Sequence, residues 1–291
     1  MELKRMTSIT AQLGEGPAWD EPSKRLYWVD ITGFRYHVYD PVGEGIETVQ
    51  VGSHLGTLAL REKGGVVLAL QDGIYCRAED EEGGVEPIWR LPDQDAGIRF
   101  NDGKCDPAGR FWAGTMAMDG RRGAGSLYRL DTDGSVHQML DGVTTSNGLA
   151  WSLDGQTMYY IDSGEPVVWA LDYERASGAI SNRRAAITFA PEDGTPDGMT
   201  IDEQGMLWIA FWGGSKVARW DAEAGRCLQE IALPCPQVTS CVFGGAARDV
   251  LYITTAREGM DADALERYPQ AGALFAVRPG VCGVPTYRYR G

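Results

Sequence analysis

Short runs of apolar and aromatic residues alternate along the chain with turns rich in glycine and aspartate, and the alternation recurs at a nearly constant interval. Six runs share the pattern: LYWVD from Leu26, VVLAL from Val66, RFWAG from Arg110, MYYID from Met158, LWIAF from Leu207 and LYITT from Leu251. Successive runs begin 40, 44, 48, 49 and 44 residues apart. Their composition is typical of strands that pack on a pleated, largely buried surface.

A turn and a second alternating segment follow each run, which predicts hairpins. Examples are FRYHVYD after the first run and KVARWD after the fifth. No segment keeps an apolar helical face for long between the turns. Strand repeats of this length are typical of β-propellers, whereas a pair of β-sandwiches imposes no such period. The sequence therefore predicts an all-β fold, a six-bladed β-propeller with four-stranded antiparallel blades around a central channel.

The repeats fill residues 1–291 without a linker, so we predict a single propeller domain. Propellers usually close their ring by pairing the two ends of the chain. We expect the segment TSITAQL, residues 7–13, to complete the last blade beside the C-terminal strands. Trp28, Trp112 and Trp208, which lie in the apolar runs, are expected to pack between blades.

The formal net charge of −14 indicates which partners to expect. An acidic surface repels phosphate backbones and anionic lipids, which argues against nucleic-acid and membrane partners and leaves small molecules and cations. The N-terminal segment lacks the apolar run of a signal peptide, so we expect a cytoplasmic protein, as a monomer or weak homo-oligomer. Six scattered cysteines without a C-x-x-C pair are then expected to be reduced thiols.

Polar residues recur at one phase of the repeat, in the strand that precedes each run. Glu15 lies 11 residues before its run, Asn101 lies 9 before, Asn147 lies 11 before and Asp197 lies 10 before. In a propeller this preceding strand is the innermost of its blade, so equal phase predicts that these side chains converge at the channel mouth. A single Asn-Gly or Asp-Gly pair usually only forms a turn, but a phase shared by four repeats favours a site.

Three of these residues, Glu15, Asn147 and Asp197, offer carboxylate and amide oxygens. Such hard ligands suit Ca²⁺, Mg²⁺ or Mn²⁺ and leave coordination positions for water or substrate. We therefore predict one divalent cation, with Ca²⁺ as first choice and Mn²⁺, Mg²⁺, Zn²⁺ or Fe²⁺ as alternatives. Trp212 is expected at the channel mouth, where it would stack on a bound ligand, and His54 is expected near the channel in the second blade.

Long motifs, in order, resemble the SMP-30/gluconolactonase/LRE family of regucalcin-like sugar lactonases. They are GEGPAWD, RFNDGKCDPAGRFWAGTM, SNGLAWSLDG with MYYIDS, ISNRR, PDGMTIDEQGMLWIAFWGG, and TSCVFGG with LYITTAREGM. The resemblance implies a six-bladed propeller that binds one divalent cation through Glu15, Asn147 and Asp197. It also implies that Arg99 and Asn101 contact the substrate.

One loop departs from the family pattern. Some members carry a longer loop with an acidic substrate contact after GTM, whereas this chain has the short, basic AMDGRRGAG with Arg121 and Arg122. Asp119 either replaces that contact or is a solvated loop residue. Asp102 and Lys104 are assigned to closing the turn and pairing at the rim, and Cys105 is expected to pack beneath them.

The resemblance implies metal-dependent hydrolysis of an aldonic-acid lactone, such as a glucono-, galactono-, xylono- or arabinono-lactone, to the open sugar acid. Asp197 is then the general base, and the cation polarises the carbonyl. Ser146, Ser240 and Cys241 are alternative nucleophiles, but the three histidines, His37, His54 and His137, form no recognisable triad with them. The alternative functions are hydrolysis of organophosphates or other esters at the same metal, and a non-enzymatic, regucalcin-like calcium-binding protein.

Overall fold

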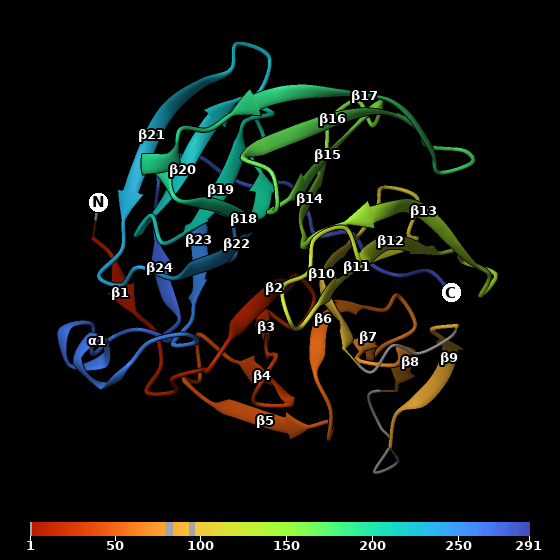
Figure 1. The fold of residues 1–291 in the computed structure, drawn as a ribbon. Helices are drawn as coiled ribbons and strands as arrows, with labels where there is room; N and C mark the ends of the chain where they lie inside the picture. The colour runs from red at the N-terminus through yellow and green to blue at the C-terminus, as the bar shows by residue number, and fades with distance from the viewer. Residues whose placement is uncertain (1, 79–83, 93–96) are drawn as a thin grey trace.

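The computed structural model describes residues 2–78, 84–92 and 97–291, in which six four-stranded antiparallel sheets surround a central axis (Figure 1). The first three blades are β2 (Gly14–Asp20), β3 (Arg25–Asp30), β4 (Arg35–Tyr39) and β5 (Ile46–Gln50); β6 (Leu55–Leu60), β7 (Val66–Leu70), β8 (Gly73–Arg77) and β9 (Glu86–Arg90); and β10 (Ile98–Cys105), β11 (Phe111–Ala117), β12 (Gly125–Leu130) and β13 (Val136–Val143). The predicted all-β, six-bladed β-propeller is confirmed.

The remaining blades follow the same order from the axis outward, except where the ring closes. They are β14 (Ser146–Trp151), β15 (Thr157–Asp162), β16 (Val167–Glu174) and β17 (Ala179–Thr188); β18 (Thr195–Ile201), β19 (Leu207–Trp212), β20 (Lys216–Asp221) and β21 (Arg226–Ala232); and β22 (Val238–Gly244), β23 (Val250–Thr255), β24 (Phe275–Val277) and β1 (Lys4–Arg5). The six apolar runs of the sequence lie on the second strand of each blade.

The N-terminal strand closes the ring in the sixth blade, but through a different segment from the one expected. The closing strand is β1, which pairs with β24 through Lys4 and Ala276. Residues 7–13 form no strand, except that Leu13 makes an isolated bridge with Ala256. The prediction of strand pairing by TSITAQL was wrong, because this segment already turns inward to enter β2 at the channel.

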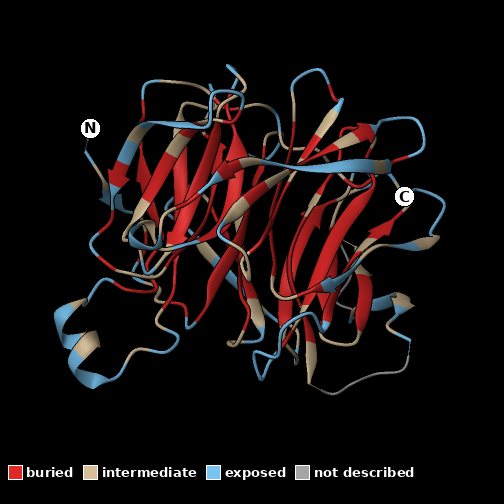
Figure 2. Cartoon of the chain, turned by 45° about the horizontal axis from the view of Figure 1, so that its top comes forward, coloured by how far each residue is buried: buried red, intermediate tan, exposed pale blue. Residues whose placement is uncertain are grey.

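Apolar side chains fill the spaces between neighbouring blades, in six clusters around the ring. Trp28 packs between blades one and six, Trp112 between blades three and four, and Trp208 between blades five and six, as predicted. The inner strands are buried along their length, whereas outermost strands such as β17 and β21 are largely exposed (Figure 2). The blades are therefore held to one another by side-chain packing.

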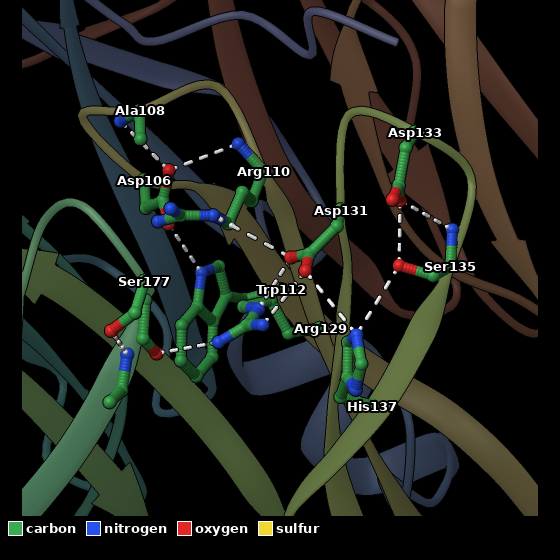
Figure 3. Close-up of polar contacts among 12 residues, drawn as sticks. Asp106, Ala108, Arg110, Trp112, Arg129, Asp131, Asp133, Ser135, His137 and Ser177 are labelled. Atoms are coloured by element: carbon green, nitrogen blue, oxygen red, sulfur yellow. Dashed lines mark hydrogen bonds and ion pairs between the residues drawn. The ribbon is translucent and has the colours of Figure 1, made fainter.

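A buried aspartate in the turn after the inner strand fixes the third blade at the end of the channel opposite the predicted mouth (Figure 3). Asp106 accepts hydrogen bonds from the backbone N–H of Arg110 at 3.0 Å and the indole N–H of Trp112 at 2.9 Å. Arg110 also donates to the carbonyl of Ala176 in the next blade. Asp202 accepts the indole N–H of Trp208 in the same way, six residues apart. A buried carboxylate is thus fully satisfied while it joins turn, strand and neighbouring blade.

Every inner strand carries a shift of register against the second strand of its blade, just beyond its first residues. In β14 the irregularity contains Asn147 and Gly148, and in β18 it contains Asp197 and Gly198. A β-bulge turns a side chain away from its ordinary direction and is common beside functional sites. Asn101, Asn147 and Asp197 thus lie inside the irregularities of their strands, whereas Glu15 still pairs with Val29 just before the shift in β2.

Glycine follows the polar residue in these bulges because the next inner strand lies against it. A Cβ on Gly148 would lie 2.8 Å from the Asp197 carbonyl oxygen, closer than such atoms approach. A Cβ on Gly198 would overlap the Ser240 side chain in the same way. The inner strands are thus packed to backbone contact around the axis.

The C-terminal segment, residues 278–291, crosses the end of the channel opposite the mouth and passes behind the blades in Figure 1. Glu203 of the fifth blade donates its N–H to the Cys282 carbonyl at 2.9 Å, and the Tyr289 N–H donates to Leu60 of the second blade at 2.8 Å. Val284 and Tyr287 line a small cavity of about 60 Å³ inside the channel. This segment ties together blades that are distant in the sequence.

The connection between β23 and β24 is the longest between strands of one blade, and its short helix α1 (Ala262–Arg267) was not predicted. Asp261 caps the helix by accepting the Ala264 N–H at 2.8 Å. No helix in the described ranges is long and apolar enough to span a membrane. All six cysteines are unpaired, and Cys105 is buried between blades two and three.

Tyr289 tests whether the C-terminal segment stabilises the ring. Its ring is 3% exposed and its hydroxyl donates to the Asp131 carbonyl at 3.1 Å. Tyr289→Ala should lower the free energy of unfolding by about 3–5 kcal/mol because a large buried ring is lost. Tyr289→Phe should cost only about 0.5–1.5 kcal/mol, the hydrogen bond alone. Urea unfolding measures both; a Tyr289→Ala protein as stable as the Phe variant would refute this role.

Candidate metal centre

The five residues predicted for the site lie together in one cavity of about 270 Å³ at the channel mouth. Glu15 comes from β2, Asn147 from β14 and Asp197 from β18, so three blades contribute the oxygen ligands. Arg99 and Asn101, both on β10, complete the set. All five side chains are at most 6% exposed. Trp212 also lines this cavity, as the sequence predicted.

A continuous chain of hydrogen bonds fixes the orientation of the two amides. Arg99 Nη1 donates to Asn101 Oδ1 at 2.7 Å, and Asn101 Nδ2 donates to Asn147 Oδ1 at 2.9 Å. Asn147 Nδ2 in turn donates to Ser163 Oγ at 2.7 Å, and this hydroxyl donates to the carbonyl of Pro196. Each donor has a defined acceptor, so the Asn147 amide nitrogen points to Ser163, away from Asn101.

Asn101 has little capacity left for other partners. Its second Nδ2 hydrogen goes to the Ser146 carbonyl at 2.9 Å, so both donors are used within the protein. Only a lone pair of Oδ1 remains for a ligand. Arg99 differs, because its Nη1 donates to Asn101 and to the Phe100 carbonyl while Nε and Nη2 make no hydrogen bond with the described residues. Arg99 is thus the better placed of the two to donate into the cavity.

The buried carboxylates carry strongly shifted pKa values. Burial, followed by the charge of Asp102, raises the pKa of Glu15 to about 8. Burial and then the charge of Glu15 raise the pKa of Asp197 well above its usual range. Burial also raises the pKa of Asp102. Glu15 and Asp197 are costly to ionise because they are removed from water and face like charges, whereas for Asp102 the cause is its removal from water, which the charge of Lys104 opposes.

Asp102 and Lys104 do not close a turn or pair at the rim, so the sequence interpretation of their position was wrong. Both lie on β10 and line the inner cavity of the channel, below the predicted ligands. The Asp102 carboxylate accepts the Gly103 N–H at 2.7 Å, and Lys104 Nζ donates to the Met199 carbonyl at 2.6 Å. Burial lowers the pKa of Lys104, and the charge of Asp102 opposes that shift. The turn itself is formed by Asp106 to Gly109.

The residues at the mouth fit a divalent cation. Asp197 Oδ1 is fully buried and has no hydrogen-bond partner among the described residues, and Asp197 lines the polar mouth cavity, so an acceptor oxygen is left for a ligand. No group of three or more His, Cys, Asp or Glu side chains in the described part of the chain is placed to hold a metal ion. A site here therefore needs the Asn147 amide beside the two carboxylates. Oxygen donors of this mixed kind suit a hard cation.

The other candidates lie outside the mouth cavity. His37, His54 and His137 are on separate blades or connections, where their ring nitrogens lie beside Thr48, Gln71 and Asp131 respectively. None of the three lines the mouth cavity. Cys241 Sγ lies 3.5 Å from the Trp208 carbonyl, and Ser146 Oγ accepts the Tyr160 hydroxyl at 2.9 Å. Asp119 lies on an exposed loop beside Arg121. It does not replace the acidic substrate contact that some family members carry in a longer loop after GTM.

Six residues that line the mouth were not predicted for the site from the sequence, and two of them, Ser163 and Glu258, carry hydrogen-bonding or charged groups used below. Ser163 follows the second strand of its blade, in the motif MYYIDS, and Glu258 begins the connection after β23, in TTAREGM. Both line the cavity, although neither lies at the phase of the inner strands. Their motifs were noticed, but the sequence pattern gave no reason to select these two positions.

Fold and site define a class: six-bladed β-propellers with a cluster of buried oxygen ligands at one mouth of the channel. The chain belongs to the SMP-30/gluconolactonase/LRE-like family, whose model matches residues 13–257. Regucalcin of Gallus gallus is 42% identical over 297 residues, which cover 100% of this chain and 99% of that protein.

Solved structures agree with this assignment. A calcium-binding regucalcin from Agrobacterium tumefaciens superposes with a TM-score of 0.94 at 27% identity, over 99% of this chain and 97% of that one. A gluconolactonase from Xanthomonas campestris superposes with a TM-score of 0.73 at 25% identity, over 94% of this chain and 88% of that one.

Ser163 provides a test of the hydrogen-bond chain that does not depend on catalysis. Ser163→Ala removes the acceptor of the Asn147 amide, so this ligand is no longer held in one orientation. Removal of such a supporting partner typically weakens metal binding about 10–100-fold, and a loss in that range is expected for Ca²⁺ or Mn²⁺ in calorimetric titration. Ser135→Ala, on a surface turn (Figure 3), is the matched control and should bind the cation like wild type. Equal affinities for both variants would show that Ser163 does not orient the ligand.

Proposed function

We propose that this protein hydrolyses the ester bond of an aldonic-acid lactone, with one divalent cation held by Glu15, Asn147 and Asp197. The observation that carries the proposal is the convergence of two buried carboxylates and one oriented amide in a single mouth cavity beside Arg99. Family membership and the resemblance to a gluconolactonase favour a lactone as the substrate.

A bound divalent cation supplies a Lewis acid that polarises a carbonyl and acidifies water. The side chains of the protein supply the other functions. Arg99 donates from Nε and Nη2 to oxygen atoms of the substrate and so orients the ester. Asn101 holds Asn147 in position and accepts from one substrate hydroxyl through its remaining lone pair. Asp197 accepts the proton of the attacking water, because it lines the cavity and its Oδ1 has no hydrogen-bond partner among the described residues.

Ca²⁺ is the cation we favour. The proposed ligands are all oxygen atoms, and Ca²⁺ takes six to eight such ligands in flexible geometry, which leaves positions for water and substrate. The calcium-binding regucalcin structure supports this choice. Mn²⁺ and Mg²⁺ also bind oxygen ligands, and Zn²⁺ or Fe²⁺ would lack the nitrogen or sulfur ligands they usually take.

Metal removal gives the direct test of this function. Wild-type protein should hydrolyse at least one five- or six-membered aldonolactone in a proton-release assay, and exhaustive chelation should abolish turnover. Added Ca²⁺ or Mn²⁺ should restore it, because the carboxylates and Asn147 are unchanged. Full turnover in protein shown by elemental analysis to be metal-free would refute the proposal.

Substitutions of Asp197 and of Arg99 should affect the kinetics of lactone hydrolysis in different ways. Asp197→Asn keeps an oxygen ligand and nearly the same volume but removes the proton acceptor, so kcat should fall by roughly 10²-fold or more. Arg99→Ala should keep the cation and lose substrate positioning, seen as a higher KM, a lower kcat, or both. Cation content, melting temperature and lactone kinetics are measured for both, with Asp119→Asn as the exposed carboxylate control. A cation-loaded Asp197→Asn variant with normal kcat would exclude Asp197 as the base.

A further inference from the structure

Glu258 is an acidic side chain of the mouth cavity that the proposed reaction does not use. It lies just after β23, at the start of the connection that contains α1, and it lines the cavity with Arg99 and Asp197. Its backbone N–H donates to the Gln12 carbonyl at 3.0 Å, which anchors the residue beside the entry to β2. The carboxylate itself makes no hydrogen bond or ion pair with any residue that the structure describes.

Glu258 and Arg99 are complementary in charge without forming an ion pair. Arg99 is buried at 6% exposure, whereas Glu258 is exposed at the mouth. Burial lowers the pKa of Arg99, and the charge of Glu258 opposes this shift, so the two groups act on each other across the cavity. A guanidinium only donates hydrogen bonds and an ionised carboxylate only accepts them.

A hydroxyl group is the ligand that uses both kinds of partner, because it donates one hydrogen bond and accepts others. Adjacent hydroxyls on one ring would accept from Arg99 and donate to Glu258. Trp212 and Met116, which line the same cavity, offer apolar surface for the C–H face of such a ring. An unsubstituted ring would use the apolar surface and still offer ester oxygens to Arg99, but it would offer no hydrogen-bond donor to Glu258.

We propose that Glu258 is a specificity-determining residue that accepts hydrogen bonds from substrate hydroxyls and so selects polyhydroxylated lactones over unsubstituted ones. The inference rests on the proposed lactone hydrolysis and adds the residue that selects hydroxylated over unsubstituted lactones. Glu258 belongs to the binding of the ring, whereas the proton transfer belongs to Asp197. Its loss therefore affects KM more than kcat.

The test compares two six-membered lactones that differ in their hydroxyl groups, D-glucono-1,5-lactone and δ-valerolactone, with Ca²⁺-loaded protein. Glu258→Ala should raise KM for the gluconolactone about tenfold and leave its kcat within about twofold, because binding rather than chemistry is lost. For δ-valerolactone, kcat/KM should change less than about twofold. Glu258→Gln, which keeps an acceptor oxygen without the charge, should fall between wild type and Glu258→Ala.

Glu266→Gln is the matched control, because Glu266 lies on α1 of the same connection, is exposed and does not line the cavity. It should retain wild-type KM for both lactones. Ca²⁺ affinity and melting temperature should be unchanged in all variants, which excludes an effect through the cation or the fold. An equal loss for both lactones, or none for either, would overturn the role of Glu258.

A binding measurement separates this inference from the proposed hydrolysis. Calorimetry with 1,5-anhydroglucitol, a ring polyol without an ester, reports hydroxyl recognition without turnover. Polyol binding that weakens about tenfold in Glu258→Ala, in a protein that cleaves no lactone, would refute the hydrolysis and retain the recognition. Lactone turnover with polyol binding unaffected by Glu258→Ala would refute the recognition and retain the hydrolysis.

Discussion

The close approach of six inner strands around one axis is the constraint on which the rest of the structure depends. Glycines such as Gly148 and Gly198 are required there, since a Cβ would meet the backbone or side chain of the next strand. The adjoining bulges contain Asn147 and Asp197, and at the mouth these side chains meet Glu15 and Arg99 from other blades. The same packing that closes the ring therefore assembles the site.

Because the site is formed by inner strands, its charged side chains lie inside the channel, where water does not stabilise them. Glu15, Asp102 and Asp197 are buried within one channel, and Arg99 and Lys104 offset only part of their charge. The hydrogen-bond chain from Arg99 to Ser163 holds the amides in fixed orientations. A propeller core made only of hydrophobic clusters would avoid this electrostatic cost, and under the proposed function the buried acidic groups are retained because they bind the cation.

The sequence predicted the features that recur in every blade. It predicted few of the features that occur only once in the chain. Blade number and the positions of Glu15, Asn147 and Asp197 follow from one period, because the same strand in each blade faces the axis. The closing strand β1 and the helix α1 occur once, so no comparison between repeats reveals them. Glu258 reaches the cavity from a connection, and Lys104 faces the inner channel, because of tertiary packing that leaves no periodic trace.

The C-terminal segment bears on how a substrate would enter the channel and how a product would leave it. Because Val284 and Tyr287 line the inner cavity at the far end of the channel, the proposed function has the substrate enter and the product leave through the mouth lined by Glu258 and Trp212. The product must then leave through the mouth before the next substrate enters. Hydrolysis of a neutral ester produces a carboxylate anion. The acidic residues of the mouth would repel this anion once it no longer contacts the cation. Under the proposed function, substrate and product would therefore occupy the cavity in turn, and electrostatic repulsion would favour release of the product.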